Sequence, residues 1–260
     1  MEYCPGPARA DMEAQELAAL RAKTEDVYRR LAGVFGVPRR RGHLDAVSEM
    51  VSTILSQNTN DTNRDRAYQR LRERFPTWEE VRDADVQEVR EAIRPAGLSE
   101  TKAPRIQAAL RYISQTQGQL TLDFLRTMPV PEAKRWLTGI KGVGPKTAAI
   151  ILLFSFGRPA FPVDTHIHRV SKRLGLIGPQ VGREAAHDIM EKLVPRKLYY
   201  PFHIDMIRHG REICQPTPRC ELCPLRELCC YYRSCLAPNR TQAAGRQITP
   251  ADCSEMAKEG

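Results

Sequence analysis

The 260-residue sequence has no long hydrophobic run. A membrane-spanning helix needs roughly 20 consecutive apolar residues, and the longest apolar stretch, from Ala148 to Phe156, has about half that length. The first residues also lack the basic start and apolar stretch of a secretory signal, because acidic residues occur early, at Glu2 and Asp11. The sequence therefore predicts a soluble protein that is not exported and has no membrane partner.

The eight cysteines are not spread along the chain as a disulfide framework would be, because six of them lie between Cys214 and Cys235. In a protein that is not exported, such local clustering indicates a metal site. The sequence also lacks convincing alternation of apolar and polar residues with period two, so it predicts no β-sheet.

Basic residues exceed acidic ones, with 40 Lys and Arg against 31 Asp and Glu, for a net charge of +9. The first 24 residues carry a net charge of −1 and residues 236–260 carry 0, so residues 25–235 carry +10. The positive charge therefore belongs to the folded body. This distribution favours a structured anionic partner such as nucleic acid, and the alternative is an Arg-rich surface that is merely solvated.

Helical periodicity dominates the sequence and predicts an all-α fold of roughly ten short helices joined by tight turns. The predicted helices span residues 24–35, 44–55, 61–75, 85–93, 101–117, 121–127, 131–138, 145–156, 164–175, 182–193 and 199–212. One more short helix should follow Thr77, which forms a capping box with Glu80. Residues 236–260 have little periodicity and are expected to form a flexible C-terminal extension.

A glycine-rich segment precedes the helix predicted to begin at Pro145. Leu137–Ala148 reads LTGIKGVGPKTA, in which Gly142 and Gly144 flank Val143. Because glycine has no Cβ, backbone N–H groups at the start of the helix could approach a phosphate closely. The spacing of a P-loop is absent and no strand precedes the segment, so it is not a nucleotide-binding loop of either common kind. The alternative is a plain turn between two helices.

A carboxylate, Asp164, falls at the start of the helix predicted over residues 164–175. It would make a good N-cap, worth about 1 kcal/mol. Alternatively, the helix end holds this carboxylate beside a cleft, where it acts as a base or an electrostatic stabiliser. His166 and His168 are two residues apart and cannot share one helix face, so they are expected to be structural and not metal ligands.

Four cysteines follow the spacing Cys-x5-Cys-x2-Cys-x5-Cys near the end of the predicted helical body. They are Cys214, Cys220, Cys223 and Cys229, and Cys230 and Cys235 follow. Four soft thiolate ligands suit an iron–sulfur cluster or a structural zinc ion. Structural zinc sites usually pair two close Cys-x2-Cys motifs, whereas this segment has one, so the spacing favours a cluster.

These three features, in this order, resemble the helix-hairpin-helix DNA glycosylases that carry a C-terminal iron–sulfur cluster, and most of all the endonuclease III family. The resemblance extends from about residue 25 to residue 232. The segment Ile54–Thr59 resembles the turn whose glutamine, here Gln57, enters the gap left by a displaced nucleotide. Gly97-Leu98, followed by Lys102-Ala103, is similar to the loop that wedges a leucine, here Leu98, into the opposite strand.

The resemblance implies two helical domains that flank a DNA-binding cleft. Residues 38–158 would form a six-helix barrel with the helix-hairpin-helix at about 137–148, and residues 1–37 with 159–235 would form the cluster domain. A structural 4Fe-4S cluster would be held by Cys214, Cys220, Cys223 and Cys229, since the family spacing favours Cys229 over Cys230. The expected phosphate contacts are Lys141, Gly142, Val143, Gly144, Arg219 and Arg226.

The resemblance also implies a reaction. The protein would be a bifunctional DNA glycosylase and AP lyase of base excision repair, monomeric, acting on double-stranded DNA that contains a damaged base or an abasic site. Lys146 would expel the damaged base, expected to be an oxidised pyrimidine, and form a Schiff base; β-elimination then cuts the strand on the 3′ side. Asp164 would deprotonate the amine and stabilise positive charge. We expect the protein in the cytoplasm, with the nucleoid if the source is prokaryotic.

Two alternatives remain open at this point. One is a mismatch or adenine glycosylase of the same superfamily, and the other is a non-catalytic iron–sulfur protein that binds DNA or senses redox state. The sequence also departs from the family pattern. Lys141 stands where the hairpin usually has proline, five residues separate Cys214 from Cys220 where six are typical, and Ser99 replaces a bulkier residue beside the wedge leucine.

Overall fold

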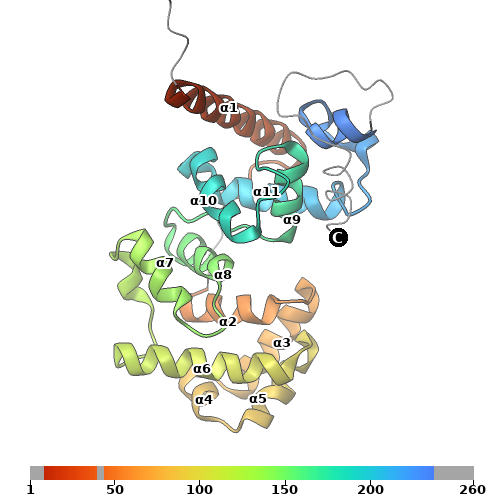
Figure 1. Ribbon diagram of the computed structural model, residues 1–260. Coiled ribbons are helices and arrows are strands. Elements are labelled where there is room, and N and C mark those ends of the chain that lie inside the picture. Colours follow the sequence, from red (N-terminus) through yellow and green to blue (C-terminus); the bar gives the residue numbers. More distant parts are fainter. Residues whose placement is uncertain (1–8, 40–43, 237–260) are drawn as a thin grey trace, which may run out of the picture. The chain divides into compact units, whose positions relative to one another are not determined.

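The computed structural model describes residues 9–39 and 44–236, which contain helices and turns but no strand (Figure 1). The predicted all-α fold is confirmed. Of these residues, 44–162 form one compact unit, the central unit, and 9–39 with 163–236 form a second, the terminal unit. Within the described residues, no helix is both long and apolar enough to cross a membrane.

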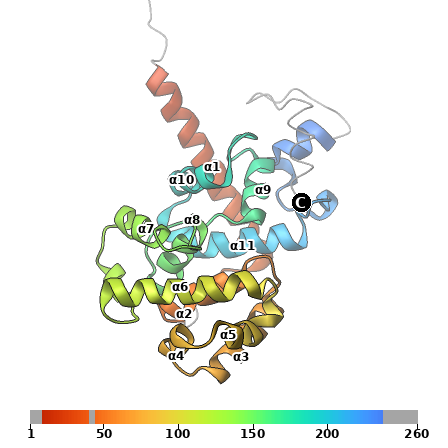
Figure 2. The ribbon, with the colours of Figure 1, turned by 60° about the horizontal axis from the view of Figure 1, so that its bottom comes forward.

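The central unit consists of short helices around one hydrophobic core. Its elements are α2 (Ala46–Ser56), α3 (Asp61–Arg74), α4 (Trp78–Asp83), α5 (Val86–Ile93), the 3-10 turn η1 (Arg94–Ala96), α6 (Ser99–Gln117), the 3-10 turn η2 (Asp123–Arg126), α7 (Val130–Thr138), α8 (Pro145–Ile150) and the π-helical turn η3 (Ile151–Ser155). Helix α6 packs against α2, α4 and α5 and lies beside them in Figure 2. Met50 and Ile54 of α2 and Ile106 and Leu110 of α6 are fully buried in the core. Each such side chain contributes about 1.5–3 kcal/mol through burial.

Local sequence signals position several of these helices. The capping box is confirmed, because Thr77 Oγ1 accepts from the Glu80 N–H at 3.2 Å and the Glu80 carboxylate accepts from the Thr77 N–H at 3.0 Å. The helix predicted over 121–127 is only the 3-10 turn η2, and the helix predicted over 145–156 is α8 continued by the wider turn η3. Nearly every residue of η3 is apolar, so the periodicity of the sequence could not reveal the change from an α-helix to a wider turn.

The terminal unit combines the N-terminal helix with the C-terminal part of the chain. It contains α1 (Arg9–Phe35), α9 (Thr165–Leu174), α10 (Arg183–Leu193), the 3-10 turns η4 (Arg196–Leu198), η5 (Cys220–Leu222) and η6 (Arg226–Leu228), α11 (Tyr199–Glu212) and the π-helical turn η7 (Tyr232–Leu236). Helices α9 and α11 pack together, and α1 lies against α10 and α11. Val27 and Leu31 of α1 are fully buried in these contacts.

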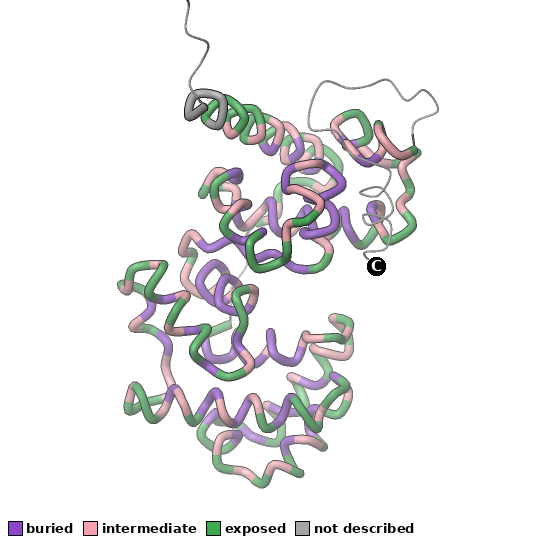
Figure 3. Tube along the Cα trace, viewed as in Figure 1, coloured by how far each residue is buried: buried purple, intermediate pink, exposed green. Residues whose placement is uncertain are grey.

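Helix α1 begins well before the predicted start at residue 24. Over residues 14–19 most of its side chains are exposed (Figure 3). This part has almost no buried face to produce an amphipathic pattern, but it is rich in alanine, leucine, glutamate and glutamine, which have high intrinsic helix propensity. The prediction missed it because it relied on periodicity.

Helix α11 buries a carboxylate, Asp205, that has no hydrogen-bond partner among the described residues. Burial raises its pKa to about 6, and Arg208 offsets part of this effect. Because the pKa of Asp205 is higher in the folded chain than in the unfolded chain, the protein is most stable at low pH, where this carboxyl group is protonated. The free energy of unfolding then falls as the pH rises from about 4 through about 6. The cost at neutral pH is roughly 2–3 kcal/mol.

We therefore expect Asp205→Asn to raise the melting temperature at about pH 8 and to change it much less at about pH 4. Thermal unfolding of both proteins at the two pH values measures this. Asp188→Asn is the control, because Asp188 is exposed on α10 of the same unit. An equal shift at both pH values would mean that the carboxylate charge is not the cause.

Candidate active site and cysteine pocket

The glycine-rich segment forms a tight turn between α7 and α8. Ile140 and Val143 are buried in the central core, and the Val143 N–H donates to the Ile140 carbonyl at 2.9 Å. Gly142 has a φ of +94°, and a Cβ added there would lie 3.2 Å from Arg105 Cδ. This position therefore requires glycine. With its apolar side chains anchored inside, the turn leaves Gly144 exposed at the start of α8.

The two lysines of this segment have different surroundings. Lys146 lies in the first turn of α8 and is half-buried, directly before the buried Thr147, while Lys141 is exposed in the turn. Pro145 occupies the first helical position, where its fixed φ suits a helix start. The rigid turn thus places the Lys146 amine on a short, well-anchored helix end.

Gln57 and Leu98, the two residues expected to enter the DNA duplex, both lie at helix ends of the central unit. Gln57 follows α2, and its Nε2 donates to the Gly142 carbonyl at 3.4 Å. Leu98 precedes α6 with a φ of +51°, and 56% of its surface is exposed. An apolar residue held in the left-handed region costs about 1–3 kcal/mol, and such strain is typical of functional sites.

Asp164 is the N-cap of α9 in the terminal unit, which is one of the two roles that the sequence predicted for it. Its Oδ1 accepts from the Ile167 N–H at 2.8 Å, and 8% of the residue is exposed. The cap bond uses one carboxylate oxygen and holds the side chain in one orientation. Capping and a chemical role are therefore compatible for this residue.

A cationic pocket lies along α9 in the same unit. The residues that line it include four basic side chains and no acidic one, and the basic ones are Arg169, Lys172, Arg183 and Arg211. They come from α9, the start of α10 and the end of α11, so no local motif pointed to them. Arg169 and Lys172 are buried, whereas Arg183 and Arg211 are exposed and attract anions. His166 and His168 also line it, where they contact Arg169 and the Val181 carbonyl, in agreement with the structural role expected of them.

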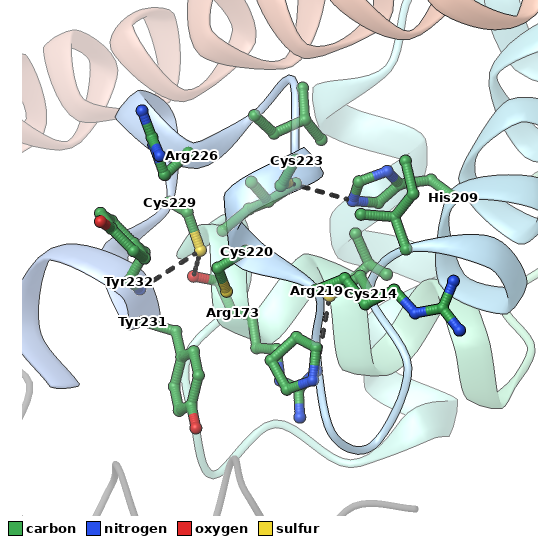
Figure 4. Close-up of a pocket in the computed structure, with 15 residues that line it drawn as sticks. Arg173, His209, Cys214, Arg219, Cys220, Cys223, Arg226, Cys229, Tyr231 and Tyr232 are labelled. Atoms are coloured by element: carbon green, nitrogen blue, oxygen red, sulfur yellow. Dashed lines mark hydrogen bonds between the residues drawn. The ribbon is translucent and has the colours of Figure 1, made fainter. Parts of the chain in front are cut away.

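The segment that follows α11 folds into a pocket lined by Cys214, Cys220, Cys223 and Cys229 (Figure 4). Cys230 is not among its lining residues, and its Sγ instead accepts from Lys23 Nζ at 3.5 Å. Arg219 and Arg226 lie at the same pocket, and both are exposed. No group of three His, Cys, Asp or Glu side chains within residues 9–39 and 44–236 is arranged closely enough to hold a metal ion.

The chemistry around these thiols nevertheless suits a thiolate-bound group. Arg173 is almost fully buried beside them, and its Nη1 donates to Cys214 Sγ at 3.4 Å. The Tyr232 N–H donates to Cys229 Sγ at 3.5 Å. A buried guanidinium and N–H donors offset the negative charge of thiolates. Burial raises the pKa of Cys223 to about 11 and that of Cys229 to about 12, so these thiols need a cation to become ligands.

Comparison with known proteins identifies the family to which the chain belongs. Residues 51–196 match the family described as HhH-GPD superfamily base excision DNA repair protein. The chain is 35% identical to endonuclease III of Thermotoga maritima over 197 residues, covering 75% of this chain and 88% of that protein. It is 32% identical to endonuclease III of Sulfolobus acidocaldarius, covering 70% of this chain and 81% of that one.

Solved structures support the same family and fold. A trapped endonuclease III–DNA covalent intermediate is 28% identical with a TM-score of 0.68, covering 82% of this chain and 95% of that chain. A thermostable thymine-DNA glycosylase has a TM-score of 0.70 at 21% identity, covering 84% of this chain and 100% of that chain, which supports the fold alone. The chain belongs to the HhH-GPD superfamily and, within it, to the endonuclease III family, and it is a DNA glycosylase of base excision repair.

Proposed function

We propose that this glycosylase is bifunctional: it removes oxidised pyrimidines from duplex DNA and then cuts the strand at the resulting abasic site. The observation that carries the proposal is the primary amine of Lys146, which a rigid, core-anchored turn presents at the start of α8. An amine can form a covalent imine with the sugar, whereas glycosylases that activate water cannot. The endonuclease III–DNA covalent intermediate known for a related protein is consistent with this assignment.

Access to the base comes first. A base stacked in the duplex hides its glycosidic carbon, so the nucleotide must be extruded at a cost of a few kcal/mol, which is smallest for damaged or mispaired bases. Leu98 and Gln57 fill the space that the nucleotide leaves. The exposure of Leu98, and the bond that fixes Gln57 to the hairpin, suit these roles.

The amine of Lys146 then attacks the sugar C1′. A C–N bond forms, the glycosidic bond breaks, and its electron pair leaves with the base, which takes up a proton. Asp164 accepts the proton that the lysine must lose and stabilises the positive charge that develops. The sugar ring then opens: the C1′–O4′ bond breaks, O4′ takes up a proton, and the C1′–N bond becomes an imine after the nitrogen loses its remaining proton or as the protonated iminium. This imine makes the 2′ proton acidic. Loss of that proton forms a C2′–C3′ double bond and expels the 3′ phosphate, which cuts the strand.

DNA binding rests on cationic and backbone groups. The hairpin residues from Lys141 to Gly144 contact phosphates in the central unit. In the terminal unit, Arg219, Arg226 and the cationic pocket along α9 do the same. The partner is double-stranded DNA, bound by a monomer in the compartment that holds the DNA. Lys and Arg contacts to phosphates release counterions, so binding should weaken steeply with salt.

The four cysteines Cys214, Cys220, Cys223 and Cys229 would hold a 4Fe-4S cluster with a structural role. Three observations support these four cysteines as ligands: they share one pocket, a buried arginine lies beside them, and N–H groups donate to two of the sulfurs. The absence of Cys230 from the pocket lining supports Cys229 as the fourth ligand. The cluster would hold Arg219 and Arg226 in place for DNA.

Incision of duplexes that each carry one lesion, with the opposite base varied, tests the proposed function. We expect the wild-type protein to cut at oxidised pyrimidines without added alkali. Asp164→Asn should slow this reaction by about 100-fold or more. Asparagine still caps the helix, so the melting temperature should change little.

Three outcomes would contradict the proposal. Base release without strand cutting would remove the lyase step, and a preference for undamaged adenine in a mismatch would favour an adenine or mismatch glycosylase. A melting temperature of Asp164→Asn that falls in step with its activity would leave Asp164 only the role of a helix cap.

A further inference from the structure

Lys102 of α6 is among the largest fully buried side chains, with 1% of its surface exposed. Its Nζ donates to the carbonyls of Leu55 and Ala96, each at 2.8 Å, and burial lowers its pKa. A buried amine is costly unless its donors are satisfied. An apolar side chain would fill this position at lower cost, so the amine needs a reason to be there.

The two acceptor residues lie close in sequence to Gln57 and Leu98. Leu55 stands two residues before Gln57, and Ala96 stands two residues before Leu98. Leu55 lies in the last turn of α2 and Ala96 ends η1, so one ammonium group holds together the two backbone segments that carry Gln57 and Leu98. The backbone N–H of Lys102 also donates to the Leu98 carbonyl at 2.9 Å.

Leu98 cannot position itself. Its side chain is mostly exposed, so core packing does not hold it, and its left-handed backbone has no side-chain cap. Gln57, in contrast, is held by its bond to the Gly142 carbonyl. The Lys102 amine is therefore the link that relates the loop of Leu98 to the turn of Gln57 and, through it, to the hairpin.

We propose that Lys102 is a positioning residue that fixes the loop of Leu98 at the distance from Gln57 at which both side chains enter the duplex together. This inference rests on the roles proposed above for Gln57 and Leu98. Lys102 acts through the two backbone segments and does not touch DNA. Without it, the extruded nucleotide is less well replaced, and extrusion becomes less favourable.

The same helix offers a matched control. Gln107 is 3% exposed on α6, and its Nε2 donates to the carbonyls of Val81 and Ala84 at 3.0 and 2.8 Å. It is also a buried donor that joins two carbonyls, but these carbonyls belong to α4 and its end, away from Gln57 and Leu98 in sequence. Gln107→Met should therefore cost stability without affecting extrusion.

The test is a double-mutant cycle on the full-length protein with Lys102→Met, Leu98→Ala, the combined variant and Gln107→Met. Single-turnover excision of an oxidised pyrimidine is measured below each melting temperature. A fluorescent adenine analogue opposite the lesion reports the loss of stacking when Leu98 enters. We expect Lys102→Met to slow excision about tenfold and to reduce the fluorescence change, and to add less than about twofold to Leu98→Ala. Gln107→Met should leave the rate and the fluorescence unchanged.

Independent, multiplicative effects of Lys102→Met and Leu98→Ala would overturn the inference, as would a fluorescence change identical to that of the wild type. If Lys102→Met does not fold, Lys102→Gln takes its place, because it retains an amide donor with shorter reach, and the same outcomes decide. A wild-type protein that neither excises the lesion nor disturbs the opposite base would instead refute the proposed function.

Discussion

A Lys146→Ala variant should form no covalent complex with damaged DNA in the presence of borohydride, and its strand cutting should fall on the order of 1,000-fold or more. Borohydride reduces the imine between the lysine and the sugar, so trapping requires this amine. Duplex binding should survive, because the proposed phosphate contacts lie on other residues. Trapping is read on a denaturing gel and binding by titration of labelled duplex at several salt concentrations.

Lys141→Ala is the matched control, because Lys141 has the same charge and lies in the same turn but is exposed. It should keep covalent trapping. Its binding should weaken, and the slope of log affinity against log salt should fall by about one, as expected for one lost phosphate contact. Undiminished trapping by Lys146→Ala, or loss of trapping by Lys141→Ala with normal binding, would show that the nucleophile is misassigned.

Cys229→Ser should lose the iron–sulfur cluster, whereas Cys230→Ser should retain it. The physical reason is placement, because Cys229 lines the pocket with the other three cysteines and Cys230 contacts Lys23 instead. Metal-ligand bonds in a small domain contribute directly to its folding, so losing them should lower the free energy of unfolding. Iron and sulfide content, visible absorption and thermal unfolding measure these changes without reference to activity.

The opposite pattern, in which Cys230→Ser loses the iron and Cys229→Ser keeps it, would make Cys230 the fourth ligand. A colourless wild-type protein with one equivalent of zinc would replace the cluster by a structural zinc ion. Both results would leave the assignment of Lys146 untouched, because the amine belongs to the central unit.

The helices were predictable where they have a buried face or a capping residue. Asp164 and the pair Thr77 and Glu80 cap helices through contacts three residues apart, which any correct helix start produces. The early part of α1 and the π-helical turn η3 were missed for opposite reasons: residues 14–19 are mostly exposed, and η3 is almost uniformly apolar. Neither shows the contrast between two faces that periodicity detects.

The residues of the candidate site also fall into two groups: those that the sequence could reveal and those that it could not. Glycines at 142 and 144, the lysine at 146 and the spacing of the cysteines are local patterns, and they were visible in the sequence. The four basic residues of the pocket along α9 come from three helices, so their proximity has no local signature. Lys102 did leave a signal, since it precedes the buried Ile106, Leu110 and Ile113 at helical spacing on the apolar face of α6.

By itself, the sequence determined the fold class, the family motifs and the candidate site residues, because these depend on residue type and on spacing of a few positions. Only the tertiary structure decided which side chains meet: that Gln57 bonds to Gly142, that Lys102 joins the segments of Gln57 and Leu98, and that Cys229 and not Cys230 shares a pocket with the other cysteines. Such contacts join residues far apart along the chain, and packing of the whole unit brings them together.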